Sequence, residues 1–331
     1  MIAILLLILW GAGCGLNEEP DLSCQLAVPQ GFTVPELPED NQLTESRIAL
    51  GKRLFHDPAL SRDYTLSCAG CHQQEKAFTD GVPVSIGIKN RVGNRNSPTL
   101  VNLAWQPYFF AEGGNPSLAM QAMGPIGEPH EMGFNAREAV DRLALIESYQ
   151  EEAQKAYGRE FDLFVLTRAL AAFERTFISG NSPFDQYQYQ GKENVLSESA
   201  KRGLDLFTSD RAACANCHPA PLFTDFSFQN IGLTNEYADP GRFRITMDTV
   251  DHGKFKVPSI RNVALTAPYM HDGSIESLSV VIEHFDQGGA GHVNQSPNVR
   301  PLGLTTQEKA DLLAFLESLT DQEFVENPNF K

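Results

Sequence analysis

Residues 68–72 read Cys68-Ala69-Gly70-Cys71-His72, and the pattern returns as Cys214-Ala215-Asn216-Cys217-His218. Two cysteines three positions apart and followed at once by histidine are typical of covalent haem c attachment: the sulfurs bond the haem vinyl groups and the histidine binds the iron. A zinc site or redox disulfides would also use paired cysteines, but neither explains the histidine after both pairs. The sequence therefore predicts two haem c groups, held by Cys68, Cys71 and His72 and by Cys214, Cys217 and His218.

The composition is that of an acidic globular protein. The chain has 331 residues, enough for two domains that each have a core. Its net charge of −16 argues against nucleic acid as a partner. The charge suits a basic partner such as a small electron-carrier cytochrome, and the alternative is that it only keeps the protein soluble.

The first residues resemble an export signal. The apolar run from Ile2 to Trp10 is too short to span a bilayer and fits a signal peptide over residues 1–13. Small residues before Cys14 resemble a lipoprotein signal, which would leave Cys14 lipidated and the protein anchored to a membrane; cleavage at another position is the alternative. Both interpretations place the protein in the periplasm or elsewhere outside the cytoplasm, where bacteria attach haem c.

Three segments are expected after the signal. Residues 14–40 are rich in proline and acidic residues and are predicted to be an acidic tether. Cys24 within it would pair with an unlipidated Cys14 or remain a free thiol. We then expect an N-terminal haem domain over residues 41–185 and a C-terminal haem domain over residues 186–325.

An internal repeat supports this division. Residues 43–46 and 196–199 share the pattern Leu-Thr/Ser-Glu-Ser, and each begins a predicted helix that carries a glycine and a Leu-Phe pair ahead of the haem motif. The first helix should end before Pro58. The repeat predicts a mainly α-helical fold of two c-type cytochrome domains, each around one covalent haem, with long loops and few short strands.

Other capping patterns predict further helices. Asn135 with Glu138 predicts one helix to about Tyr157, with inward-facing Val140, Leu143 and Ile146. Asp162 and Thr305 are expected to cap two more helices. Residues 182–191 are interpreted as the domain junction.

Two haems on one chain can have different roles. An iron with an open sixth position can bind and split peroxide, whereas an iron closed by a second protein ligand only passes electrons. Splitting the O–O bond also requires an acid that protonates the leaving oxygen. The sequence must therefore provide an acid beside one of the two haems.

Several motifs outside the haem sites resemble a known family, the bacterial di-haem cytochrome c peroxidases with the related MauG-type enzymes. The likeness covers roughly residues 43–320. It is carried by these segments: Leu50-Gly51-Lys52-Arg53-Leu54-Phe55, Ala77-Phe78-Thr79-Asp80-Gly81, Arg95-Asn96-Ser97-Pro98-Thr99, Glu131-Met132, Lys256-Val257-Pro258, Arg261-Asn262-Val263 and Ala267-Pro268-Tyr269-Met270-His271-Asp272-Gly273.

The resemblance implies roles for individual residues. Glu131 matches the family's distal acid at the peroxide-binding haem, and Gln121 matches the glutamine that lines the same pocket. Asn96, Thr266 and Pro268 match the positions that hold a calcium ion between the domains. The alternatives are a solvated loop glutamate, an ordinary surface glutamine and simple turn formers.

The chain also departs from the family pattern. Ile88 stands where some peroxidases have a histidine that closes the peroxidatic iron at rest, so the haem on His72 is expected to rest open. Ala111 replaces the tryptophan between the haems, unless Trp105, Phe109 or Phe110 takes its place. Phe285 replaces the methionine or tyrosine ligand of the second haem, where His284, Met270 or His271 could substitute or the position could stay open. His130, beside Glu131, is a candidate for tuning the distal pocket.

The leading hypothesis is a di-haem cytochrome c peroxidase. Electrons from a small cytochrome c would enter at the haem on His218, and hydrogen peroxide would be reduced to water at the haem on His72 with Glu131 as acid and base. Two alternatives stay open, a MauG-like oxidase that modifies a partner protein and a non-enzymatic electron carrier or haem sensor. A homodimer is a further expectation.

Overall fold

The computed structural model describes residues 21–331, so the predicted signal peptide and Cys14 lie outside the described residues. This part of the chain is mainly helical. Its one sheet pairs β1 (Phe228–Gln229) and β2 (Phe255–Lys256) in antiparallel register, with Phe228 opposite Lys256. Between residues 21 and 331, no helix combines the length and the apolar character needed to cross a membrane.

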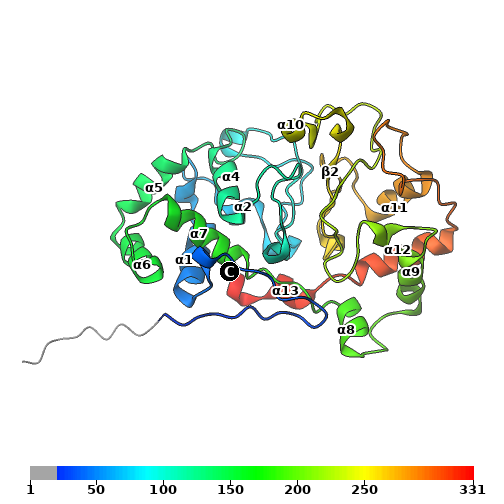
Figure 1. The fold of residues 1–331 in the computed structure, drawn as a ribbon, viewed down its shortest axis with the longest axis horizontal. Helices are drawn as coiled ribbons and strands as arrows, with labels where there is room; N and C mark the ends of the chain where they lie inside the picture. Colours follow the sequence, from blue (N-terminus) through cyan, green and yellow to red (C-terminus); the bar gives the residue numbers. More distant parts are fainter. Residues whose placement is uncertain (1–20) are drawn as a thin grey trace, which may run out of the picture.

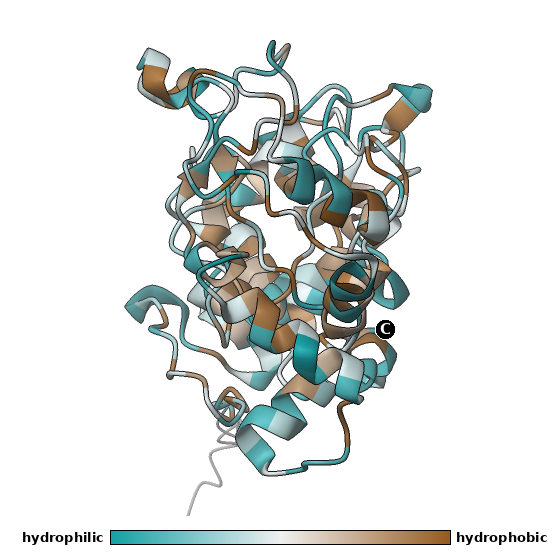
Figure 2. Cartoon of the chain, turned by 90° about the vertical axis from the view of Figure 1, so that its right-hand side faces the viewer, coloured by the Kyte–Doolittle hydropathy of each residue, from teal (hydrophilic) through white to brown (hydrophobic). Residues whose placement is uncertain are grey.

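The helices form two halves that lie side by side (Figure 1). The first half contains α1 (Glu45–His56), α2 (Cys68–Cys71), α3 (Leu118–Gln121), α4 (Met123–Gly127), α5 (Ala136–Ala144), α6 (Glu147–Tyr157) and α7 (Leu163–Glu174). The second contains α8 (Pro183–Gln190), α9 (Glu198–Thr208), α10 (Phe243–Thr246), α11 (Leu278–Gln287) and α12 (Thr306–Glu317), and α13 (Gln322–Glu326) follows. Each half has its own apolar core, and Figure 2 shows hydrophobic helix segments in the middle of the molecule.

Most of the predicted helix ends are confirmed. Thr44 caps α1, which ends at His56 just before Pro58. Ser197 and Asp162 cap α9 and α7 through their side chains. Thr305 forms the predicted capping box at the start of α12. Side chains that satisfy the first free N–H groups therefore set these helix boundaries.

The predicted single helix over residues 135–157 is wrong, because the chain breaks between α5 and α6. Ile146 adopts an extended conformation (φ −96°, ψ 113°) and is 40% exposed rather than inward-facing. A continuous helix in phase with Leu143 would turn Glu147 toward the core. The break shifts the phase so that Tyr149 is buried instead. Within residues 182–191, which the sequence marks as the domain junction, the chain forms α8 with a capping box at Ser182.

The internal repeat is visible as the same helix contact in both halves. A β-carbon at Gly51 in α1 would lie 1.9 Å from a backbone oxygen of α7 and 2.8 Å from Cβ of Phe173. A β-carbon at Gly203 in α9 would lie 1.9 Å from a backbone oxygen of α12 and 2.8 Å from Cβ of Phe315. The glycines let each helix pair approach backbone to backbone, so Phe173 and Phe315 occupy equivalent positions.

Hydrogen bonds after these helices extend the match. The Asn102 N–H donates to the Phe177 carbonyl at 2.8 Å, and the Asn262 N–H donates to the Leu319 carbonyl at 3.0 Å. Both asparagines have left-handed backbone conformations. The two halves can therefore be aligned position by position along their last helices.

Both ends of the described chain pack against the body. The Gln74 side chain donates to the carbonyl of Phe324 at 3.1 Å, and Phe324 and Phe330 belong to the core of the first half (Figure 1). At the other end, the indole N–H of Trp105 donates to the Thr33 carbonyl at 2.7 Å. Part of the segment expected to be a tether is thus held along the body, and the C-terminal segment returns to the first half.

Candidate active site

The first haem motif is arranged to present one imidazole nitrogen. Cys68 and Cys71 begin and end the single turn of α2, and the turn brings the next residue, His72, back over it. Nδ1 of His72 lies 2.8 Å from the carbonyl oxygen of Phe78. An Nδ1–H donor to a carbonyl fixes the ring and leaves Nε2 as the free ligand. Burial lowers the pKa of His72, which favours the neutral form that binds iron.

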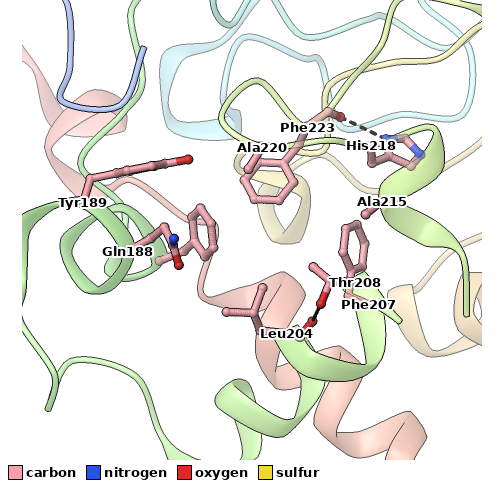
Figure 3. A pocket seen from close by; sticks show the side chains of 10 residues that line it. Gln188, Tyr189, Leu204, Phe207, Thr208, Ala215, His218, Ala220 and Phe223 are labelled. Atoms are coloured by element: carbon pink, nitrogen blue, oxygen red, sulfur yellow. Dashed lines mark hydrogen bonds between the residues drawn. The ribbon is translucent and has the colours of Figure 1, made fainter. Parts of the chain in front are cut away.

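The second motif repeats this geometry beside an apolar cavity. Nδ1 of His218 lies 2.9 Å from the carbonyl oxygen of Phe223. Figure 3 shows His218 at the edge of a cavity of about 150 Å³ with Leu204 and Phe207 in its wall. Burial lowers the pKa of His218 as it does for His72. An apolar wall opposite a free imidazole nitrogen is what a haem face requires.

The cysteines fit haem attachment better than zinc or redox chemistry. Burial raises the pKa of Cys71 and of Cys214 to about 11, so both are neutral thiols at pH 7. All four motif cysteines are unpaired, as is Cys24. Within residues 21–331, no cluster of three or more histidine, cysteine or acidic side chains could hold a metal ion. The residues present therefore fit two haem c groups.

Glu131 lies at the first haem motif. Its negative charge contributes to the raised pKa of both Cys68 and Cys71. Glu131 is exposed at the surface, but the surrounding protein still desolvates its carboxyl group. This desolvation and the negative charge of Glu128 together raise the pKa of Glu131. This gives the first haem motif an acid with a raised pKa that acts on its cysteines.

A tight backbone contact holds the Glu131 loop in place. The N–H of Ile88 donates to the carbonyl of Glu131 at 2.9 Å. A β-carbon at Gly87 would lie 2.0 Å from the carbonyl oxygen of His130, so the two loops meet without room for a side chain. Ile88 itself is 2% exposed. Ile88, which stands where some family members have a capping histidine, is thus packed directly against the loop that carries Glu131.

Two other distal candidates have less defined positions. Gln121 is the last residue of α3, is half-buried, and its side chain has no hydrogen-bond partner among residues 21–331. His130 is exposed, and its Nδ1 lies 3.1 Å from a carboxylate oxygen of Glu128. The structure gives His130 a contact with Glu128 rather than with Glu131.

The far side of the second haem offers few free ligands. Phe285 is half-buried on α11. Nε2 of the neighbouring His284 lies 3.1 Å from the carbonyl oxygen of Ile231. The ring of His271 stacks on Phe255 at 4.1 Å between centroids. Both histidines thus have other contacts.

The two halves meet through matching loops. Residues 109–115 form a loop closed by a bridge between its end residues, and residues 269–275 form a loop closed in the same way. Ala111 and His271 occupy the same position in the two loops. Trp105 turns toward the N-terminal segment, where its ring lies 5.5 Å from that of Phe32.

These loops exchange equivalent hydrogen bonds between the halves. The N–H of Asn96 donates to the carbonyl of His271 at 2.8 Å, and the N–H of Lys256 donates to the carbonyl of Ala111 at 2.7 Å. The interface is therefore pseudo-symmetric, like the contact between two copies of one subunit. The bond from Asn96 also joins it to the segment that carries the other calcium candidates, Thr266 and Pro268.

Charged residues that the sequence did not single out reinforce this interface. Arg95 bridges Glu112 of its own half and Asp239 of the other half, at 2.7 Å from Nε to the Asp239 carboxylate. Nζ of Lys256 donates to the carbonyl of Tyr108 at 2.7 Å, and burial lowers the pKa of Lys256 to about 8. Arg95 and Lys256 lie in segments that carry the family resemblance, but no sequence pattern gave them a role at the interface.

Comparisons with known proteins agree on the family. The family model described as di-haem cytochrome c peroxidase matches residues 45–194. MauG of Methylorubrum extorquens is 39% identical over 85% of this chain and 80% of its own, and cytochrome c551 peroxidase of Nitrosomonas europaea is 33% identical over 89% and 83%. A MauG-like protein associated with microbial copper homeostasis has a similar crystal structure, with a TM-score of 0.88, 35% identity and 93% and 99% of the chains covered. The chain belongs to the family of di-haem cytochrome c peroxidases and MauG proteins.

Proposed function

We propose that the protein is a di-haem cytochrome c peroxidase that reduces hydrogen peroxide to water at the haem on His72. Electrons from a small cytochrome c enter at the haem on His218. The observation that carries the proposal is the position of Glu131, whose charge acts on both cysteines of the first motif. Ile88 supports it, because an aliphatic side chain cannot close the iron that peroxide must reach.

The reaction consumes one hydrogen peroxide, two electrons and two protons and yields two water molecules. A haem held by His72 would supply the iron that binds and reduces the peroxide. Glu131 would accept a proton from the bound peroxide and donate it to the leaving oxygen, which departs as water. Burial raises the pKa of Glu131, which favours the protonated form that donates to the leaving oxygen. Gln121 positions the peroxide by hydrogen bonding.

The remaining features of the proposal concern location and partners. Haem c attachment supports a periplasmic or other extracytoplasmic location, and Cys14 would provide a lipid anchor. The acidic surface supports docking of a basic cytochrome. Asn96 and the carbonyls of Thr266 and Pro268 would hold a calcium ion that orders the interface. A homodimer is the proposed assembly.

Stopped-flow mixing tests the function. The holoprotein is mixed with reduced cytochrome c and peroxide, and cytochrome oxidation is followed. We expect rapid oxidation for the wild type and a loss of about 10²–10⁴-fold in Glu131→Gln, the range for a lost general acid–base group. Glu138→Gln is the matched control, because Glu138 is an exposed carboxylate on α5 that does not act on the pKa of Glu131. No oxidation above background by protein with both haems would refute the proposal.

A MauG-like oxidase is the second candidate, favoured by the relatives of that name and by the MauG-like crystal structure. Ala111 and Phe285 weigh against it, because they replace side chains that help to spread an oxidation across the haems in that enzyme. Peroxide-driven modification of a protein encoded by a neighbouring gene, without cytochrome oxidation, would select this candidate. An inert electron carrier would instead show two six-coordinate irons by EPR and no reaction with peroxide.

A further inference from the structure

One carboxylate breaks the equivalence of the two halves. Because Phe173 and Phe315 make the same contact with the facing glycine, the next residue in each helix is also equivalent. That residue is Glu174 at the end of α7 and Leu316 in α12. Leu316 packs against the apolar core of the second half. The first half therefore has an ionisable group where the second half has a hydrocarbon.

The carboxyl group of Glu174 is buried without a hydrogen-bond partner. It is 6% exposed, and its Oε2 atom is buried with no hydrogen-bond partner. Among residues 21–331, neither carboxylate oxygen accepts a hydrogen bond from another residue. An unpaired buried carboxyl group destabilises a fold, and a leucine at the equivalent position shows that the fold itself does not require one.

Glu174 directly follows Phe173, and Cys68 of the first haem motif packs against the apolar core to which Phe173 belongs. The charge of Glu174 is the largest electrostatic contribution to the raised pKa of Cys68, whose sulfur would bond the haem. No carboxylate contributes in this way to the pKa of Cys214, the equivalent cysteine of the second half. Glu174 thus acts on one haem site only.

The surroundings of Glu174 bring the pKa of its carboxyl group into a range where it can gain and lose a proton. Burial raises the pKa of Glu174 to about 8, and Arg175 on the same helix opposes this shift. The helices packed against α7 do carry charged residues: Glu45, Arg47, Lys52, Arg53 and His56 on α1, and Arg137, Glu138, Asp141 and Arg142 on α5. Among residues 21–331, Arg175 is the charged group that acts on the pKa of Glu174. A haem iron nearby would add a further positive charge.

We propose that Glu174 is the redox-linked proton site of the haem on His72, binding one proton when that haem accepts one electron and releasing it on reoxidation. The assignment of the reactive haem to His72 rests on the proposed function. The electron comes from the donor cytochrome, the proton comes from water, and both leave together. Glu174 is thus a positioning residue that holds a proton within the haem domain, while Glu131 exchanges protons with the peroxide.

Electrostatics give the direction of the coupling. An ionised carboxylate near the iron stabilises its oxidised, more positive state and so lowers the reduction potential. Reduction removes that positive charge and makes proton binding to Glu174 more favourable, and the two effects are reciprocal by linkage. The haem on His218 lacks the effect because Leu316 carries no proton.

Spectroelectrochemical titration of the holoprotein between pH 6 and pH 10 tests the coupling. The two haems are resolved by their spectra, and chemical mediators replace the cytochrome. For the haem on His72 we expect a potential that falls around pH 8 with a slope approaching ~59 mV per pH unit, the value for one proton per electron. Glu174→Gln and Glu174→Leu should both remove this slope, and the second introduces the residue that the other half already accepts.

Two internal controls separate Glu174 from other groups. The potential of the haem on His218 should not change in either variant, and Glu131→Gln should keep the slope. A slope that persists in both Glu174 variants, or a wild-type potential that does not change with pH, would overturn the proposal. Because the titration contains no peroxide, a chain that fails to oxidise cytochrome c but shows the slope would refute the proposed function alone.

Discussion

Breaking the buried ion pair between Asp185 and Arg261 should unfold the second half at much lower denaturant concentration. The Arg261 side chain is fully buried, and both of its Nη atoms lie 2.8 Å from the Asp185 carboxylate. Its Nε donates to the carbonyl of Pro221 at 2.7 Å. Asp185→Asn removes the compensating negative charge but keeps the shape, so the guanidinium remains buried as an uncompensated cation. Removing one partner of such a pair costs about 3–5 kcal/mol.

The magnitude is large against the whole stability of the protein. Domains are typically stable by about 5–15 kcal/mol, so this loss would remove about a fifth or more of that stability. The loss should appear first at the second haem, because Phe223, on which Arg261 also packs, lines the cavity beside His218. Urea unfolding followed by circular dichroism and by haem absorption measures both effects.

The double variant Asp185→Asn/Arg261→Met separates a charge effect from a packing effect. It removes the stranded cation and should recover much of the loss, because buried ion pairs are often replaceable by apolar groups of similar volume. Glu198→Gln breaks the exposed ion pair with Lys201 and should change the stability little. An Asp185→Asn protein whose free energy of unfolding lies within about 1 kcal/mol of the wild-type value would refute the reasoning, because removing one partner of a buried ion pair costs about 3–5 kcal/mol.

Three further variants test other parts of the structure. Glu174 should make the free energy of unfolding depend on pH, because its pKa is raised from about 4.5 to about 8 in the folded protein. Between these pH values the folded state binds a proton that the unfolded state does not, so the stabilising contribution of this proton is complete below pH 4.5 and is lost up to pH 8 at about 1.4 kcal/mol per pH unit. Glu174→Gln should flatten this pH dependence in urea titrations. Ile88→His should offer a sixth ligand to the haem on His72, seen by EPR as a loss of high-spin ferric signal and by a slower reaction with peroxide. Gly51→Ala should cost more than about 1–3 kcal/mol by thermal unfolding, because its β-carbon would overlap a backbone oxygen of α7 rather than a movable side chain.

The sequence predicts those parts of the fold that depend on neighbouring residues. A haem motif is a local pattern, and a cap needs only the side chain and the N–H groups of the next turn, so Thr44 and Thr305 could be assigned correctly. The break at Ile146 could not, because an unbroken helix satisfies the local pattern equally well. The break depends on the burial of Tyr149, whose hydroxyl donates to Asp57 far away in the chain at 2.5 Å.

The same limit applies to the candidate site. The resemblance assigned Glu131 by its motif, and the structure adds its effect on Cys68 and Cys71. Arg95 and Asp239 were not predicted as partners, because their contact joins loops from different halves. No sequence pattern marks Glu174 either, since a glutamate at the end of an amphipathic helix is ordinarily solvated.

The pseudo-symmetry explains why these missed residues matter. Two equivalent halves would give two equivalent haems, and electrons would have no preferred destination between them. The direction must come from positions where the halves differ, and the described structure places three such differences around the interface and the first haem: Ala111 against His271, Asn96 against Lys256, and Glu174 against Leu316. Of the three, Glu174 against Leu316 exchanges an ionisable carboxyl group for a hydrocarbon inside a haem domain. A duplicated cytochrome thus becomes directional when one copy can bind a proton beside its haem and the other cannot.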